Sequence, residues 1–146
     1  MIQINVDLTH DQVMRTMIDL IRPSLLHRII IAGSDSAVVE LDLRRRGFLR
    51  VSTTSRSTPR GQYSIGLISG QHCLQALEKS VTEISAFLSP SAAIALVIDF
   101  PSAGSNLKVR AQLARLGFQI EAGVRCREQF LLSARRRSLS QMTDAA

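Results

Sequence analysis

The sequence predicts a three-layer α/β sandwich with a mostly parallel sheet of about six strands and a C-terminal antiparallel hairpin. Between residues 28 and 117, short apolar runs alternate with amphipathic helical stretches, the pattern of strand–helix–strand units. The last two apolar runs, 118–126 and 128–136, leave no room for a helix between them, so they can pair only antiparallel. We expect one domain over residues 1–137, with the strand order 2-1-3-4-6-5, and a disordered tail over 138–146.

The first 27 residues are expected to form an arm and a covering helix. Residues 2–8 alternate strictly between apolar and polar side chains, which is the period of a half-buried strand. Thr9 and Gln12 then have the spacing of a capping box at a helix start. Pro23 should end that helix.

A strand, a tight turn and a helix come next. The run RIIIAG, residues 28–33, is short and continuously apolar, which is typical of a strand buried on both faces. Ser34 or Ser36 can cap a helix over residues 36–46. Gly47 stands where a helix end favours a residue in the left-handed conformation.

Two further strands lie close together in the chain. FLRVSTT, residues 48–54, and YSIGLIS, residues 63–69, are separated only by a polar loop with Pro and Gly. Apolar residues at spacings of three and four then predict a helix from Leu74 to Leu88, ended by Pro90.

The most apolar strand and one more helix precede the hairpin. AAIALVIDF, residues 92–100, belongs at the centre of the sheet. Asn106 can cap a helix over residues 107–116, and Gly117 should end it.

The net charge is +6, and only two of the 18 cations are Lys. The charge gathers at residues 44–46, at Arg56 with Arg60, and at residues 135–137. A pI near 10.6 is compatible with nonspecific binding to nucleic acid. One Tyr, no Trp and two Lys argue against a dedicated nucleic-acid reader.

Neither a metal site nor a membrane span is indicated. The two cysteines are far apart in the sequence, and the three histidines lack ligand spacing. The apolar stretch over residues 84–98 is shorter than the roughly 20 residues of a transmembrane helix. The first ten residues lack the basic start and apolar core of a signal peptide, so we expect a cytoplasmic protein.

Alternation of strands and helices that ends in an antiparallel hairpin resembles the class I S-adenosylmethionine-dependent methyltransferase fold, which is Rossmann-like. In that family the last strand of the hairpin inserts into an otherwise parallel sheet. The resemblance covers about residues 11–137 and rests on the order and length of the elements. The chain looks abridged, because only the loop 54–62 stands where the family has a further strand and helix.

The resemblance implies a cofactor site for S-adenosylmethionine at the turn AGSDSA. Gly33 matches the first glycine of the family's Gly-rich turn, whereas Ile31 occupies the position of its acidic residue. The second strand ends in hydroxyl residues where the family has a ribose-binding carboxylate. No catalytic residue is indicated. The implied cofactor-binding residues are Gly33, Ser34, Asp35, Ser36, Thr53, Thr54 and Ser69.

Two other functions remain open. Arg56, just past the second strand, could pair with the 2′-phosphate of NADP, although the dinucleotide fingerprint survives only as Gly33. Alternatively, the chain is a non-catalytic interaction module whose cofactor turn has decayed. An apolar arm over residues 2–8 would then pair as an unprotected edge strand in a homodimer.

Overall fold

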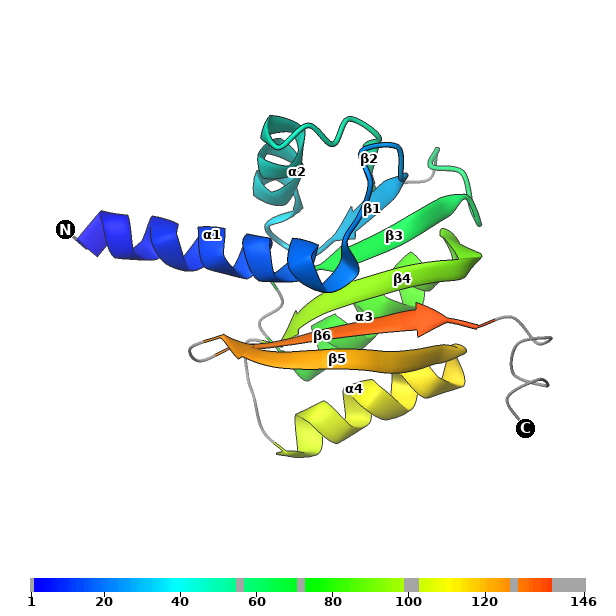
Figure 1. The fold of residues 1–146 in the computed structure, drawn as a ribbon. Coiled ribbons are helices and arrows are strands. Elements are labelled where there is room, and N and C mark those ends of the chain that lie inside the picture. Colours follow the sequence, from blue (N-terminus) through cyan, green and yellow to red (C-terminus); the bar gives the residue numbers. More distant parts are fainter. Residues whose placement is uncertain (1, 55–56, 71–72, 99–102, 127–128, 138–146) are drawn as a thin grey trace.

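The computed structural model describes residues 2–54, 57–70, 73–98, 103–126 and 129–137. Six strands form one sheet between two layers of helices, which confirms the predicted three-layer architecture (Figure 1). In chain order the elements are α1 (Ile2–Ile21), β1 (Ile29–Ala32), α2 (Ser36–Arg45), β2 (Val51–Thr53), β3 (Tyr63–Ile68), α3 (Leu74–Ser85), β4 (Leu88–Ile98), α4 (Ala103–Arg115), β5 (Phe118–Cys126) and β6 (Gln129–Arg136).

The strand order is β2-β1-β3-β4-β6-β5, as the sequence predicts. β1 pairs in parallel with β2 and β3, and β3 pairs in parallel with β4. β6 runs antiparallel to both of its neighbours, β4 and β5. The short hairpin therefore inserts its last strand between β4 and β5, and the carboxyl ends of β1, β3 and β4 meet at one edge of the sheet (Figure 1).

Each face of the sheet carries its own apolar core. Helices α1 and α2 cover one face, where Met17 packs in the same cluster as Ile31. Helices α3 and α4 cover the other, where Leu77 packs in the same cluster as Ile30. Adjacent residues of β1 thus point into opposite cores, which is why its sequence is continuously apolar.

The predicted N-terminal strand is wrong. Residues 2–8 belong to α1, a single helix of 20 residues. Seven alternating residues are too short a pattern to exclude a helix, and here the helix of residues 11–21 continues back through them. No Gly or Pro precedes Pro23 to interrupt the helix, so Thr9 lies within it and does not begin it. An N-terminal strand that pairs two copies has no counterpart in this structure.

The third helix ends earlier than expected, at Ser85, and Pro90 lies inside β4. The register explains how the strand tolerates a residue without an N–H group. Tyr63 pairs with Leu88, but Ile65 already pairs with Ala93, so β4 bulges away from β3 around Pro90.

Other element ends also shift from their predicted places. α4 begins at Ala103, and Asn106 lies inside it, where its side-chain oxygen accepts a hydrogen bond from Arg110 Nε over 2.9 Å. β2 is shorter than predicted and ends at Thr53. Gly47 has the expected positive φ, 98°. The predicted tail over 138–146 lies outside the described residues. Within the described ranges, no helix is both long and apolar enough to cross a membrane.

Candidate functional site

The turn after β1 is packed tightly against the end of β3. Gly33 has a φ of 125°, a conformation that L side chains rarely adopt. A Cβ at this position would overlap the carbonyl oxygen of Ser69 and lie 2.8 Å from its carbonyl carbon. The backbone of Ser69 donates a hydrogen bond to Ala32 over 3.3 Å. Glycine is therefore required here by the approach of two neighbouring strand ends.

Side chains of the turn reinforce this contact. Ser34 Oγ donates a hydrogen bond to the carbonyl oxygen of Gly70. Ser69 Oγ donates to Asp35 Oδ1 over 2.6 Å. A Cβ on Gly70 would come within 2.7 Å of the same Asp35 oxygen and 2.8 Å of Ser34 Oγ. The two strand ends are thus joined by two hydrogen bonds whose geometry depends on a second glycine.

Asp35 occupies the N-cap position of α2, where its side chain makes no capping hydrogen bond. The prediction that Ser34 or Ser36 caps the helix is wrong, because the Ser34 hydroxyl is used at Gly70 and Ser36 is the first helical residue. The half-buried Asp35 carboxylate lies at the positive end of the helix dipole, which stabilises its charge. A negative group therefore stands at the carboxyl edge of the sheet.

Thr53 and Thr54 lie on the other flank of β1. The register pairs Thr53 with Ile31, two residues before Gly33, and Thr54 follows it at the end of β2. Both side chains are half-buried. Thr58 Oγ1 donates to the Thr53 carbonyl over 3.0 Å, which holds Thr58 at the end of β2.

The structure therefore brings Gly33, Ser34, Asp35 and Ser69 together, places Ser36 at the start of α2, and sets the two threonines beside them. Sequence reasoning missed the role of Gly70. The sequence signal that could have revealed this role is a glycine just after β3, the strand that pairs with β1. Arg56, on which the NADP alternative depends, lies outside the described residues.

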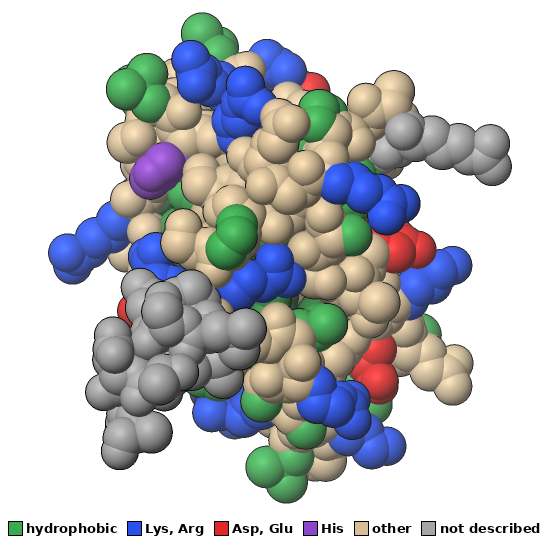
Figure 2. All heavy atoms as spheres, turned by 90° about the vertical axis from the view of Figure 1, so that its right-hand side faces the viewer, with side chains coloured by type: hydrophobic (Ala, Val, Ile, Leu, Met, Phe, Trp, Pro, Cys, Tyr) green, Lys and Arg blue, Asp and Glu red, His purple; other side chains and the backbone are tan. Residues whose placement is uncertain are grey.

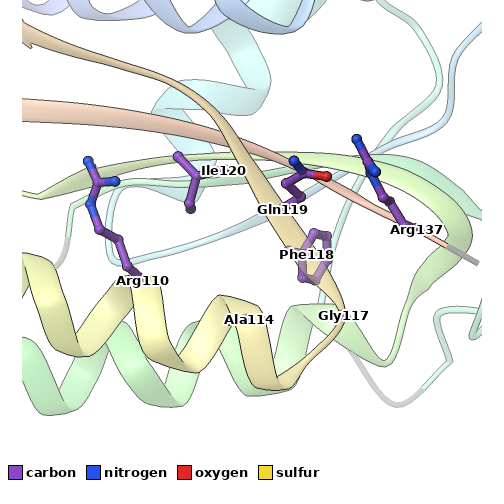
Figure 3. A pocket seen from close by; sticks show the side chains of 7 residues that line it. All are labelled: Arg110, Ala114, Gly117, Phe118, Gln119, Ile120 and Arg137. Atoms are coloured by element: carbon purple, nitrogen blue, oxygen red, sulfur yellow. The ribbon is translucent and has the colours of Figure 1, made fainter. Parts of the chain in front are cut away.

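A separate hollow of about 540 Å³ lies between α4 and β5, away from the turn after β1. Arg110 and Arg137 stand at its two ends in Figure 3, with Ile120 and Phe118 between them. Because this hollow is lined by the outer strand and its helix, it is not part of the predicted cofactor site. Among the described residues, no three His, Cys, Asp or Glu side chains are grouped closely enough to hold a metal ion.

No protein-family model and no curated protein sequence matches the chain. Solved structures do match its fold. Magnesium protoporphyrin IX methyltransferase from Synechocystis PCC 6803, solved with bound S-adenosylmethionine, has a TM-score of 0.66 at 12% identity and covers 93% of this chain and 84% of its own. The 1,6-didemethyltoxoflavin-N1-methyltransferase of Burkholderia thailandensis was solved with S-adenosylhomocysteine. Its match has a TM-score of 0.56 at 14% identity and covers 93% of this chain and 87% of the methyltransferase.

The cyclase SpnF is also similar, with a TM-score of 0.64 at 12% identity over 87% of this chain and 80% of its own. At such identities the likeness shows the fold alone. The chain has the class I S-adenosylmethionine-dependent methyltransferase-like fold.

Proposed function

We propose that the protein binds S-adenosylmethionine at the turn after β1 and uses it as a methyltransferase. The observation that carries this proposal is the Asp35 carboxylate, held beside Gly33 by the Ser69 hydroxyl at the carboxyl edge of the sheet. Open α/β sheets bind ligands at this edge. A fixed negative charge favours a ligand with positive charge, and both the sulfonium and the amino group of S-adenosylmethionine are positive.

A dinucleotide fits the same turn less well. Its pyrophosphate would bind at the N-terminus of α2, where backbone N–H groups favour anions. Asp35 occupies that N-cap position, so its carboxylate would repel the pyrophosphate at close range. The charge at the turn thus supports S-adenosylmethionine over NADP.

S-adenosylmethionine supplies a methyl group on a positively charged sulfur. The residues of this chain would hold and orient it: Gly33 permits close approach of the backbone, Asp35 would face the positive groups, and the hydroxyls of Thr53 and Thr54 would contact the ribose. Proximity and orientation then carry most of the catalysis, and no base is required of the chain.

Hydroxyls in place of a ribose-binding carboxylate should weaken the cofactor complex. Each charge-assisted hydrogen bond that is lost is worth about 1.5–3 kcal/mol. One such loss lowers the affinity by one to two decades. We therefore expect the protein to bind S-adenosylmethionine more weakly than a site with a ribose-binding carboxylate does.

Titration calorimetry with S-adenosylmethionine, S-adenosylhomocysteine, NADP and NAD tests the proposal. We expect saturable binding of the first two and none of the dinucleotides. Asp35→Asn keeps an oxygen that can accept from Ser69 but removes the charge, and should weaken S-adenosylmethionine binding about tenfold, which corresponds to 1.4 kcal/mol. Asp19→Asn, an exposed residue of α1, is the matched control and should have no effect.

Two binding results would overturn the proposal as a whole, and a third would overturn the assignment to the turn. One is the absence of binding by S-adenosylmethionine and S-adenosylhomocysteine at millimolar concentration. The other is NADP binding that is tighter than either. Equal weakening by Asp35→Asn and Asp19→Asn would show that the turn is not the site.

A non-catalytic interaction module is the second candidate, because Ser34 and Asp35 already bond within the protein. Leu25, Leu26 and Leu49 are exposed by 56%, 74% and 68%. They stand near the starts of β1 and β2 and offer an apolar surface for a second copy. Sedimentation of the wild type and of Leu26→Glu tests this module: a concentration-dependent dimer that the variant abolishes supports it, and a monomeric wild type excludes it.

A further inference from the structure

Four arginines stand along the edge of the sheet opposite the turn after β1. Arg28 directly precedes β1, Arg50 directly precedes β2, and Arg60 lies three residues before β3. Arg137 follows β6, and its backbone donates a hydrogen bond to Gly117, just before β5, over 3.1 Å. We call these four residues the arginine row. They are distant in sequence and are aligned only by the strand order.

Contacts between neighbouring strand ends fix this alignment. The carbonyl of Arg50 accepts a hydrogen bond from Ile29 over 2.8 Å, and Arg28 and Arg50 line one hollow of about 230 Å³. The Arg60 guanidinium lies 6.0 Å from the ring centroid of Phe87, which directly precedes β4. The row therefore extends from β2 across the sheet to the start of β5.

The charges of the row are not neutralised within the part of the chain that the structure describes. All four arginines are exposed. None is among the ion pairs of the described residues, which join Arg15, Arg44, Arg46 and Arg135 to carboxylates. Figure 2 looks onto this edge and shows many more basic than acidic side chains across it.

Helix dipoles do not account for the row. A cation in the last turn of a helix offsets the partial negative charge there, which explains Arg44, Arg45 and Arg115. No member of the row lies in a helix. Four uncompensated guanidiniums on one edge repel one another, so an anionic partner would relieve that repulsion.

We propose that the arginine row binds the phosphate backbone of duplex nucleic acid without sequence preference. Guanidinium groups form paired, charge-assisted hydrogen bonds with phosphate. Six strands about 4.8 Å apart span roughly 24 Å. Seven base pairs, at about 3.4 Å each, cover the same length.

The burial of the aromatic residues favours double-stranded over single-stranded nucleic acid as the partner. Single-strand binders stack bases on exposed aromatic rings. Phe48, Tyr63, Phe87 and Phe118 are all less than 10% exposed, and Phe130 is partly buried. The described part of the chain offers charge without a stacking surface, so recognition should rest on the duplex backbone.

An acidic polypeptide is the competing partner. Apolar anchors usually accompany charge at a protein interface. The exposed leucines of this edge lie beside Arg28 and Arg50, at one end of the row only. The uniformly charged phosphate backbone of a duplex therefore matches the whole row better than an acidic polypeptide does. The arginine row is independent of the proposed cofactor site, because it lies at the opposite edge of the sheet.

Fluorescence anisotropy with two unrelated 20-base-pair DNA duplexes, at 50–200 mM salt, tests the proposal on the full chain. Four phosphate contacts predict a slope of about −3.6 for log K against log salt, or roughly a 150-fold loss of affinity over this range. Both duplexes should bind alike, and the single strands more weakly. The variant with Arg28, Arg50, Arg60 and Arg137 changed to Gln should lose at least about 30-fold at 50 mM salt.

A second quadruple variant is the control. Arg15, Lys79, Lys108 and Arg125 changed to Gln remove the same charge from α1, α3, α4 and the far end of β5. This variant should bind within about threefold of the wild type. If the row variant fails to fold, the single change Arg50→Gln replaces it and should make the slope less steep by about 0.9.

Four outcomes would overturn the proposal: no saturable binding at 50 mM salt, equal losses in the two quadruple variants, single strands bound as tightly as the duplexes, or displacement of the duplex by an acidic polypeptide. Poly-glutamate that displaces the duplex at equal charge concentration would assign the row to an acidic polypeptide. None of these measurements uses S-adenosylmethionine, so the two proposals fail separately.

Discussion

The hydroxyl of Ser69 donates a hydrogen bond to Asp35 Oδ1 over 2.6 Å, and this bond joins two loops 34 residues apart in sequence. Ser69 is only 7% exposed, whereas the carboxylate it contacts stands at the sheet edge. The bond holds a negative charge in place beside Gly33. It therefore links the stability of the turn to the electrostatics of the proposed cofactor site.

Removal of this hydroxyl should destabilise the fold. A hydrogen bond to a charged group is worth about 1.5–3 kcal/mol, and Ser69→Ala leaves the half-buried carboxylate without that donor. We expect a loss of about 1–2 kcal/mol in the free energy of unfolding, measured by urea denaturation. Ser91→Ala, an exposed serine of β4, should change it by less than about 0.5 kcal/mol. Equal values for the two variants would contradict the structural role of the Ser69 bond.

Substitution of Gly33 should be far more damaging than substitution of other glycines. Gly33→Ala adds a Cβ that overlaps the Ser69 backbone and strains a φ of 125°, so we expect at least about 3 kcal/mol of destabilisation. Gly61→Ala meets open space at a φ of 72° and should cost only the strain, about 1–2 kcal/mol. Gly104→Ala, in α4 and in open space, should be neutral or stabilising by up to about 1 kcal/mol.

Chemical denaturation of these three variants measures their free energies of unfolding and so the order of their stabilities. A Gly33→Ala protein as stable as Gly61→Ala would show that the turn is looser than the contact with Ser69 implies. Because Gly33→Ala should disturb folding itself, it is unsuitable as a test of cofactor binding, which is why Asp35→Asn is preferred there.

The topology could be predicted because it depends on local patterns. Continuous apolar runs such as 29–32 indicate strands buried on both faces, and the missing helix between 126 and 129 determines the antiparallel hairpin. The N-terminal strand was mispredicted because residues 2–8 continue the helix of residues 11–21, although their seven-residue alternation has the period of a strand. A pattern that short cannot distinguish the two without a breaker nearby.

The candidate site was predictable only in part. A glycine after the first strand marks the turn, but its contact with Ser69 depends on the pairing of Ala32 with Ile68 between β1 and β3. Sequence spacing does not encode that register. The arginine row is similar, since each arginine looks unremarkable beside its own strand until the strand order aligns all four.

Arg46 should matter more than its neighbour Arg45. Its guanidinium contacts Asp42 of α2 over 2.9 Å and Asp11 of α1 over 2.7 Å, and so joins two helices on one face of the sheet. Although its partial burial opposes the charged form, these two carboxylates raise the pKa of Arg46. Arg46→Gln should lower the free energy of unfolding by about 1 kcal/mol, with a smaller effect at 1 M salt.

Arg45→Gln is the matched control, because Arg45 is exposed and is not among the ion pairs of the described residues. It should change the free energy of unfolding by less than about 0.5 kcal/mol. If Arg46→Gln behaves like Arg45→Gln in low salt, the contact between α1 and α2 contributes nothing to stability.

Arg136 supports the bulge that accommodates Pro90 in β4. Its guanidinium donates hydrogen bonds to the carbonyls of Leu88 over 3.0 Å and Ser85 over 3.1 Å, and lies 4.7 Å from the ring centroid of Phe118. Arg136→Met keeps much of the apolar stem but leaves these part-buried carbonyls without their donor. We expect a loss of about 2–3 kcal/mol in the free energy of unfolding.

The pH dependence of this loss follows from the sign of the pKa shift. Burial lowers the pKa of Arg136, so its protonation is less favourable in the folded than in the unfolded chain, and stability would rise only as pH passes through the lowered pKa. Because an arginine stays charged below about pH 9 in both states, the difference between wild type and Arg136→Met should be equal at pH 6 and pH 9. Urea denaturation at the two values measures it. A difference that grows by more than about 1 kcal/mol at pH 9 would mean that the guanidinium loses its proton there in the folded state.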